Sequence, residues 1–256
     1  MPGCSPARQM RLEVLRRQIA RTGNFPARLE EGVPLGVTVD GCLTGGLARG
    51  ALHEIAAADH RSTPAALGFL LALSSPVYRG GVESKGRRRG PLLWPFVKTT
   101  QTFGAPYAPG LKFFGFDPSC FVFVRCANAH ECLWAMEEGL RLGGIAAVIG
   151  VRAKAMDLTA SRRLQLAAEQ ANTPVFLLRR YNDNAPSAAV TRWRVSPAPS
   201  ARDQFGFYKN PRFRVALEYA RGGKTGEWVM EWDHDAFSLR LSSALDDRTA
   251  GESRVA

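Results

Sequence analysis

The residues best placed to do chemistry stand where an apolar strand, residues 51–57, runs into a helix that begins near Thr63. In nucleotide-binding proteins with this strand, turn and helix, a glycine-rich turn and a lysine hold the phosphates at the helix N-terminus. Here the segment after Ile55 reads AAADHRSTP, with neither glycine nor lysine, and Pro64 has no N–H to donate. Phosphate binding at this turn is therefore not expected.

Nucleotide hydrolysis would also need carboxylates that hold magnesium and activate a water. The apolar run IAAVIG, whose end would carry the magnesium-binding aspartate, finishes in Gly150. No Asp or Glu stands in residues 92–116, where a water-activating carboxylate would be sought. The sequence therefore predicts a protein that is not an enzyme and that uses no cofactor.

Other short motifs give equally weak indications of catalysis. A GKT triplet stands at residues 223–225, but the complete GxxxxGK motif needs a glycine where Glu218 stands, so a hairpin turn is the better interpretation. His53 and Glu54 lack the second histidine of HExxH, and residues 233–235 (DHD) are most simply a turn. The four histidines leave open a site assembled from distant parts of the chain.

The cysteines predict neither a disulfide framework nor a zinc site. They number five, at positions 4, 42, 120, 126 and 132, and no two form a CxxC pair. Cys120, Cys126, His130 and Cys132 are close in sequence, but buried small residues are the expected role for the cysteines. This usage favours a reducing cytoplasm.

Short apolar runs alternate with helical patterns along the chain, and this alternation indicates an α/β fold with a mainly parallel sheet flanked by helices. Strands are expected at residues 91–97, 120–126, 145–151 and 174–180, and helices at 107–116, 129–142 and 157–172. Thr63 is expected to cap the helix that Pro64 begins. Beyond Tyr181, runs such as TRWRV and RFRVALEYA, separated by turns, predict antiparallel strands that extend the sheet.

These patterns divide the chain into three parts. An amphipathic helix and linker occupy residues 1–34, the core spans residues 35–242, and a flexible tail covers 243–256. Within the core, residues 35–180 are expected to alternate between strands and helices, and residues 181–242 are expected to form the antiparallel extension. The stretch RGGVESKGRRRGP, residues 79–91, predicts a basic loop.

The net charge of +11 and the pI near 10.0 favour a polyanionic partner such as DNA. Arginine outnumbers lysine so strongly that the codon bias of a GC-rich genome is an alternative explanation. No apolar run approaches the ~20 residues of a membrane span, and the N-terminus has no apolar signal region, so we expect a cytoplasmic protein without membrane contact.

One segment resembles the leading part of RecA-like proteins: VTVDGCLTGGLARGALHEI, residues 37–55. The matching residues are Asp40, Gly45, Gly46, Leu47, Gly50, Glu54 and Ile55. Further segments, YAPGLKFFGFDPSCFVFVR, LWAMEEGLRLGGIAAVIG, LTASRRLQLAAEQANTPVFLLRR and TRWRV, resemble the ImuA family in this order. The likeness spans roughly residues 35–241, apart from the basic loop, which looks like an insertion.

The resemblance implies a RecA-like core of the P-loop type with a degenerate nucleotide site. It also implies an accessory role in the SOS response and translesion synthesis, beside an error-prone polymerase and an inactive Y-family-like polymerase homologue. Two alternatives remain: an ATP-dependent RecA-like recombinase, and a cell-division inhibitor of the SulA type.

Two surfaces are candidates for contacts with partners. Arg192 and Arg194 alternate with Trp193, and Arg212 and Arg214 flank Phe213, so a strand would place the arginines outward, toward DNA phosphates, and the rings inward. The alternative is a solvated strand face, because no stacking aromatic shares the arginine side.

The second candidate surface is the apolar stripe of the N-terminal helix. Leu12, Leu15 and Ile19 recur at helical spacing among arginines, ahead of a Gly-Asn-Phe-Pro break. This stripe is expected either to dock a partner or to fold back on the protein's own core.

Overall fold

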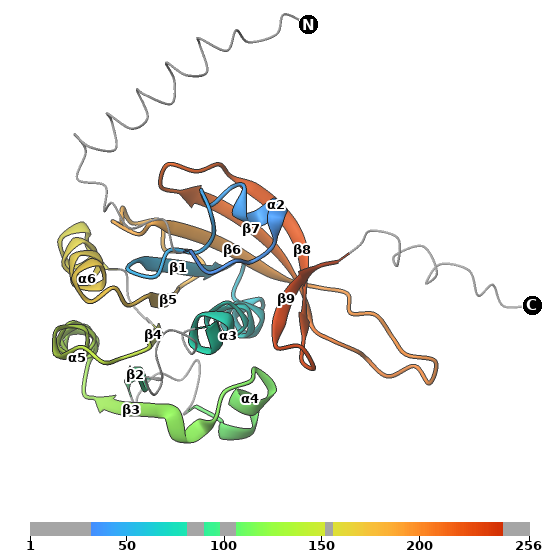
Figure 1. The fold of residues 1–256 in the computed structure, drawn as a ribbon, viewed down its shortest axis with the longest axis horizontal. Helices are drawn as coiled ribbons and strands as arrows, with labels where there is room; N and C mark the ends of the chain where they lie inside the picture. The colour runs from blue at the N-terminus through green and yellow to red at the C-terminus, as the bar shows by residue number, and fades with distance from the viewer. Residues whose placement is uncertain (1–31, 81–89, 98–105, 152–155, 243–256) are drawn as a thin grey trace, which may run out of the picture.

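The computed structural model describes residues 32–80, 90–97, 106–151 and 156–242 (Figure 1). The strands are β1 (Leu52–Ala57), β2 (Leu92–Val97), β3 (Phe121–Cys126), β4 (Ala147–Val151), β5 (Val175–Arg179), β6 (Thr191–Ala198), β7 (Arg212–Ala220), β8 (Gly226–Asp233) and β9 (Ser238–Leu241). The helices are α2 (Val37–Asp40), α3 (Thr63–Gly80), α4 (Ala108–Phe113), α5 (Ala129–Leu142) and α6 (Leu158–Ala171), with a 3₁₀ turn η2 (Pro118–Cys120).

All nine of these strands form one sheet in the order β3-β2-β4-β5-β1-β6-β7-β8-β9. The pairs from β3 to β6 are parallel, and those from β6 to β9 are antiparallel. The expected fold class, a mainly parallel sheet flanked by helices and extended by C-terminal antiparallel strands, is confirmed. Helix α4 is shorter than the expected 107–116, because Gly115, with a φ of +77°, turns the chain soon after it.

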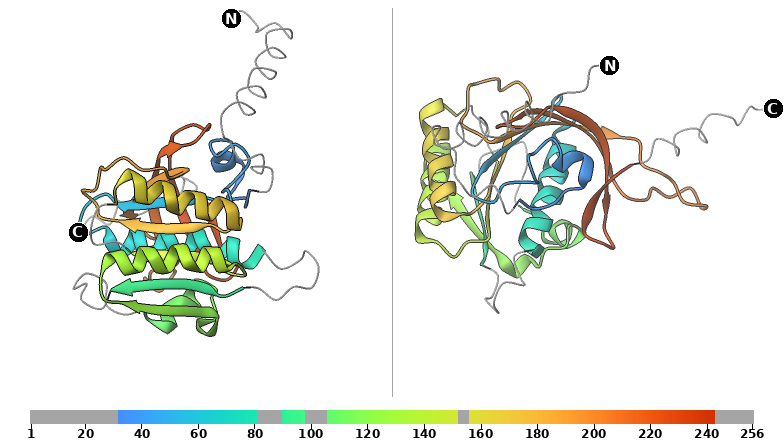
Figure 2. Two further views of the ribbon diagram at one scale, coloured as in Figure 1. Left: turned by 90° about the vertical axis from the view of Figure 1, so that its left-hand side faces the viewer. Right: turned by 45° about the horizontal axis from the view of Figure 1, so that its top comes forward.

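Helices cover the two faces of the parallel part differently (Figure 2). Helix α3 lies on one face, in the larger core cluster, and it is apolar nearly all round, with Phe69, Leu70 and Leu73 fully buried. Helices α5 and α6 lie on the other face, over a smaller core. The connection leaving β1 thus runs over one face while the later helices occupy the opposite one, which places a topological switch point beside β1.

The antiparallel extension curls around α3 (Figure 2). Its inward side chains alternate along each strand, and Trp193, Phe213 and Trp232 are almost completely buried. The ring of Phe69 on α3 lies 5.7 Å from Trp193 and 5.9 Å from Phe213, centroid to centroid. The large rings of the late strands therefore belong to the core.

Three predicted segments fall largely or wholly outside the described residues. They are the N-terminal helix with its linker in residues 1–34, the basic loop 79–91 and the tail 243–256. Leu12, Leu15 and Ile19 lie in the first of them, so their docking role stays a prediction.

Candidate functional site

The turn between β1 and α3, residues 58–62, is the position where a nucleotide-binding protein would hold phosphate. Its anion position is filled by the chain itself, because the Asp59 carboxylate accepts a hydrogen bond from the Ser62 N–H at 2.8 Å. The backbone and side-chain hydrogen bonds of Ser62 hold the pKa of Asp59 below its usual value. A fixed negative charge at the start of α3 repels a phosphate rather than binding it.

The start of α3 differs by one residue from the expected cap. Thr63 lies in the first helical turn, where its hydroxyl donates to the His60 carbonyl at 2.8 Å. The Ser62 carbonyl accepts the hydrogen bond of Ala66 N–H at 3.0 Å, so Ser62 takes the capping position. Pro64 still lies in the first turn, where its missing N–H costs nothing.

Gly150, near the end of β4, occupies the place where a magnesium-binding aspartate was sought. A Cβ added there would overlap the side chains of Met136 on α5 and Leu177 on β5. The strand is buried at this point, so a larger residue would have to displace the flexible ends of these two side chains. Gly150 therefore offers no side-chain oxygen to a metal ion.

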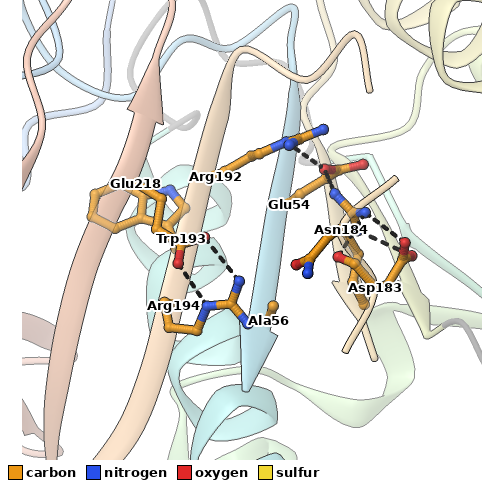
Figure 3. Close-up of a pocket in the computed structure, with 9 residues that line it drawn as sticks. Glu54, Ala56, Asp183, Asn184, Arg192, Trp193, Arg194 and Glu218 are labelled. Carbon is orange, nitrogen blue, oxygen red and sulfur yellow. Dashed lines mark hydrogen bonds and ion pairs between the residues drawn. The ribbon is translucent and has the colours of Figure 1, made fainter. Parts of the chain in front are cut away.

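A polar pocket lies on the other side of β1 from α3, among β1, β5 and β6 (Figure 3). At its base is Glu54, whose side chain is 2% exposed. Its carboxylate accepts hydrogen bonds from Arg179 Nη1 at 2.5 Å and from Ser187 Oγ at 2.7 Å, and it pairs with Arg192 Nε at 3.3 Å. Each oxygen of this buried carboxylate therefore has a partner.

Arg179 links this carboxylate to the segment after β5. Its guanidinium bonds Asp183 at 2.8 and 3.2 Å and also donates to the carbonyls of Asp183 and Ala185. Burial alone would lower the pKa of Arg179, but the Asp183 hydrogen bonds and the charges of Glu54 and Asp183 raise it. The pocket lining is thus a set of matched charges that fixes residues 183–187 against the sheet.

The size of the pocket agrees with a structural role. The pocket is partly open to solvent, and its volume is about 80 Å³. Small-molecule sites span roughly 300–1,000 Å³, so this pocket is small for such a site. The pocket is lined by an ion-pair network, and its small volume favours a structural role.

His53 is the buried end of a second polar network. Its Nε2 lies 2.8 Å from the Ala48 carbonyl and its Nδ1 lies 2.8 Å from Thr191 Oγ1, which also accepts from Trp193 Nε1 at 2.8 Å. Desolvation lowers the pKa of His53 to about 4. A neutral ring that donates to Ala48 and accepts from Thr191 satisfies all these contacts, so His53 ties β1 to β6 and to the preceding loop.

The motifs interpreted as turns lie in turns. Residues 223–225 connect β7 to β8, and the Lys224 N–H donates to the Cys42 carbonyl at 2.9 Å. Residues 234–237 form the turn between β8 and β9, where the Asp233 carboxylate accepts from the N–H groups of Asp235 and Ala236. Both interpretations are confirmed.

The clustered cysteines occupy separate packing environments. Cys126, at the end of β3, and Cys132, on α5, are buried in the smaller core, whereas Cys120 Sγ accepts a hydrogen bond from the Tyr78 hydroxyl at 2.7 Å. Within the described residues, no three His, Cys, Asp or Glu side chains gather in a group that could hold a metal ion.

The four arginines Arg192, Arg194, Arg212 and Arg214, called the arginine row below, lie on one outer face of β6 and β7. The rings of Trp193 and Phe213 point inward, as expected. Three members of the row are already paired. Arg192 contacts Glu54, Arg194 makes two bonds of 2.7 and 3.1 Å to Glu218, and Arg212 bonds Glu231 at 2.6 Å. Arg214 is exposed, and its side chain forms no ion pair or hydrogen bond within the described residues. DNA contact by all four stays a prediction, and these ion pairs weaken it for the first three.

A further surface was missed by sequence reasoning. Residues 199–211, which connect β6 to β7 and are called the tip hairpin below, expose Phe205, Phe207 and Tyr208 by 75%, 69% and 68%. The signal was the run FGFYK between two expected strands, where turn residues are usually small and polar.

Fold and site together define an α/β protein whose mainly parallel sheet carries ion-pair networks and a closed turn at the place of a phosphate site. None of the helices in the described ranges is long and apolar enough to cross a membrane. A scan against models of protein families finds no match. The chain is 36% identical over 226 residues to Protein ImuA of Caulobacter vibrioides, strains NA1000 and ATCC 19089, covering 82% of this chain and 88% of each relative. The chain belongs to the ImuA family.

Proposed function

We propose that the protein is a non-catalytic accessory factor in SOS-induced mutagenesis, where it assists translesion DNA synthesis. Membership in the ImuA family supports a role in this damage response, and the extent of the match, 88% of the relative's length, supports a role for the whole protein. The proposal includes a RecA-like core whose nucleotide site has degenerated.

The observation that carries the non-catalytic part is the occupied turn after β1. In open α/β sheets, ligands bind beyond the carboxyl ends of strands at a switch point, and the β1 turn lies at such a point. There Asp59 accepts the amide that would otherwise face a phosphate. Gly150, near the end of β4, offers no carboxylate to a metal ion. Both features argue against the recombinase alternative.

A protein of this kind acts through its partners. The proposed partners are an error-prone translesion polymerase and an inactive Y-family-like polymerase homologue, with DNA as a further candidate. The apolar stripe Leu12, Leu15 and Ile19 is the proposed docking element. The cytoplasm is the proposed location, and the free cysteines at positions 42, 120, 126 and 132 support it.

The test is a gene deletion scored for two processes. We expect damage-induced mutation frequency to fall to the uninduced level while homologous recombination stays normal. Re-expression of the intact gene from another locus should restore induced mutagenesis. Normal induced mutagenesis in the deletion strain would contradict the proposal, and a recombination defect would favour the recombinase. Filamentous cells on overexpression would favour the division inhibitor.

The docking element has its own test. Replacing Leu12, Leu15 and Ile19 by serine should weaken capture of the two polymerase partners in a pull-down, while the thermal unfolding of the core stays unchanged. A variant with serine at the exposed positions Val37 and Leu142 is the matched control. Full capture by the first variant would move the interface elsewhere.

A further inference from the structure

The tip hairpin projects from the body of the molecule between β6 and β7 (Figure 1, orange). Its three rings, Phe205, Phe207 and Tyr208, are each about 70% exposed. Most rings in this structure pack inward, as Trp193 and Phe213 do on the strands that lead into the hairpin. Three aromatic side chains displayed together on a protruding turn are typical of a contact surface.

Hydrogen bonds within the tip hairpin hold the backbone that carries the exposed rings. Asp203 organises the tip, since its carboxylate accepts from the N–H groups of Phe205 and Phe207, both at 2.9 Å. The Gly206 N–H donates to the Asp203 carbonyl at 3.0 Å, and Gly206 has a φ of +81°, which glycine adopts without strain. An antiparallel bridge joins Arg202 to Tyr208. The rings are therefore held out by the fold of the hairpin itself.

Cationic groups accompany the rings. The Arg202 guanidinium lies 4.3 Å from the centre of the Tyr208 ring and donates to the Tyr208 hydroxyl at 2.6 Å and to the Gly206 carbonyl at 3.3 Å. Three of its five N–H donors have no such partner. Lys209 is exposed next to Tyr208, and Arg214 is exposed further along β7. The one acid of the tip, Asp203, is engaged by backbone amides. Stacking surfaces and phosphate-binding cations thus occur side by side.

We propose that the tip hairpin is a contact site for single-stranded DNA, in which Phe205, Phe207 and Tyr208 stack on unpaired bases while Arg202 and Lys209 bind phosphates. Sites for single strands combine these two elements, and stacking tolerates any base sequence. The rings cannot stack on bases that are paired within a duplex. The flanking cations and the net charge of +11 favour this ligand over an apolar pocket of a protein partner.

This proposal deepens the accessory function, for which DNA was named above only as a further candidate partner, because it gives the DNA a site and a strandedness. It also differs from the arginine row, whose Arg192, Arg194 and Arg212 are held by carboxylates. The rings that alternate with the arginine row, Trp193 and Phe213, are buried, whereas the tip hairpin exposes three rings that could stack on a base.

The test is binding of the purified full chain to a fluorescent oligothymidylate, measured by anisotropy at low salt. The variant Phe205→Ala, Phe207→Ala, Tyr208→Ala should bind at least ~10-fold more weakly, because stacking contributes roughly 1–3 kcal/mol per base. Trp134→Ala, which removes a ring that is 60% exposed on α5, is the matched control and should bind normally. Thermal unfolding of both variants should match the parent protein.

A second ligand separates stacking from charge. An abasic oligonucleotide of equal length should bind the intact protein about as weakly as oligothymidylate binds the triple variant. Equal binding of both ligands by the intact protein, or unchanged oligothymidylate binding by the triple variant, would overturn the proposal. Normal DNA binding with lost capture of the polymerase partners would assign the hairpin to a protein instead. None of these results depends on the mutagenesis phenotype of the deletion strain.

Discussion

The β1–α3 turn and the tip hairpin use the same device with opposite results. In each, an aspartate carboxylate accepts backbone N–H groups: Asp59 takes the amide of Ser62, and Asp203 takes those of Phe205 and Phe207. The first carboxylate occupies the place where an external anion would bind. The second shapes a turn that presents rings and cations to the solvent.

The difference lies in what surrounds each turn. The β1 turn follows a strand whose residues are all buried, and the networks of Glu54 and His53 fix that strand to its neighbours. The hairpin extends beyond the sheet and contributes little to the core. Under the proposed function, the turn that binds phosphate in nucleotide-binding proteins serves stability here, and the contact with DNA is assigned to a protruding loop.

The largest effect should come from the network beneath the first region. Glu54→Leu leaves Arg179 and Arg192 without their buried partner, and breaking such a pair costs about 3–5 kcal/mol of unfolding free energy. Glu218→Leu, in the same pocket but on a carboxylate that is 40% exposed, should cost less than ~1 kcal/mol. Urea denaturation measures both. Equal losses would show that the charges around β1 do not determine its stability.

A second effect concerns pH. Because burial lowers the pKa of His53 to about 4, its contribution is complete above the unfolded value of 6.5 and is lost as pH falls toward 4. The 2.5-unit interval corresponds to about 3 kcal/mol at most. His53→Gln should flatten the fall in unfolding free energy between pH 7 and 4. The same slope in parent and variant would exclude His53 as its source.

A smaller effect is expected from loosening the hairpin without removing its rings. Asp203→Ala deletes the acceptor for two amides, so the rings lose their fixed display, and affinity for oligothymidylate should fall by about 3- to 10-fold through lost preorganisation. Thermal unfolding should not change. Tighter binding by Asp203→Ala would show that the negative charge, rather than the shape of the hairpin, controls the contact.

The smallest effect is expected at the first turn. Asp59→Ala should lower the melting temperature slightly, because α3 loses the acceptor at its N-terminus, yet it should not create ATP retention. The turn still lacks glycine and lysine, so removing the carboxylate opens no phosphate site. If either the parent or the variant retained radiolabelled ATP and hydrolysed it, the claim that the β1–α3 turn binds no phosphate would be contradicted.

Much of this fold follows from local patterns. Apolar runs located β2, β3, β4 and β5, and alternation along β6 and β7 placed Trp193 and Phe213 inward. Local patterns do not determine which arginines are neutralised. Arg192 meets Glu54 because β6 lies beside β1 in the sheet, a pairing between residues far apart in the chain. The exposed rings of the tip hairpin were missed for a related reason, since exposure depends on how far the loop extends from the core.

The most direct test compares the two regions in one cell-based measurement. A strain lacking the gene is supplied with the parent protein, with the triple hairpin variant, or with His60→Glu, Arg61→Glu, which places two carboxylates in the β1–α3 turn. After DNA damage, the account predicts that the turn variant restores induced mutation frequency to the parent level, whereas the hairpin variant leaves it close to that of the deletion strain. A defective turn variant beside a fully active hairpin variant would contradict it.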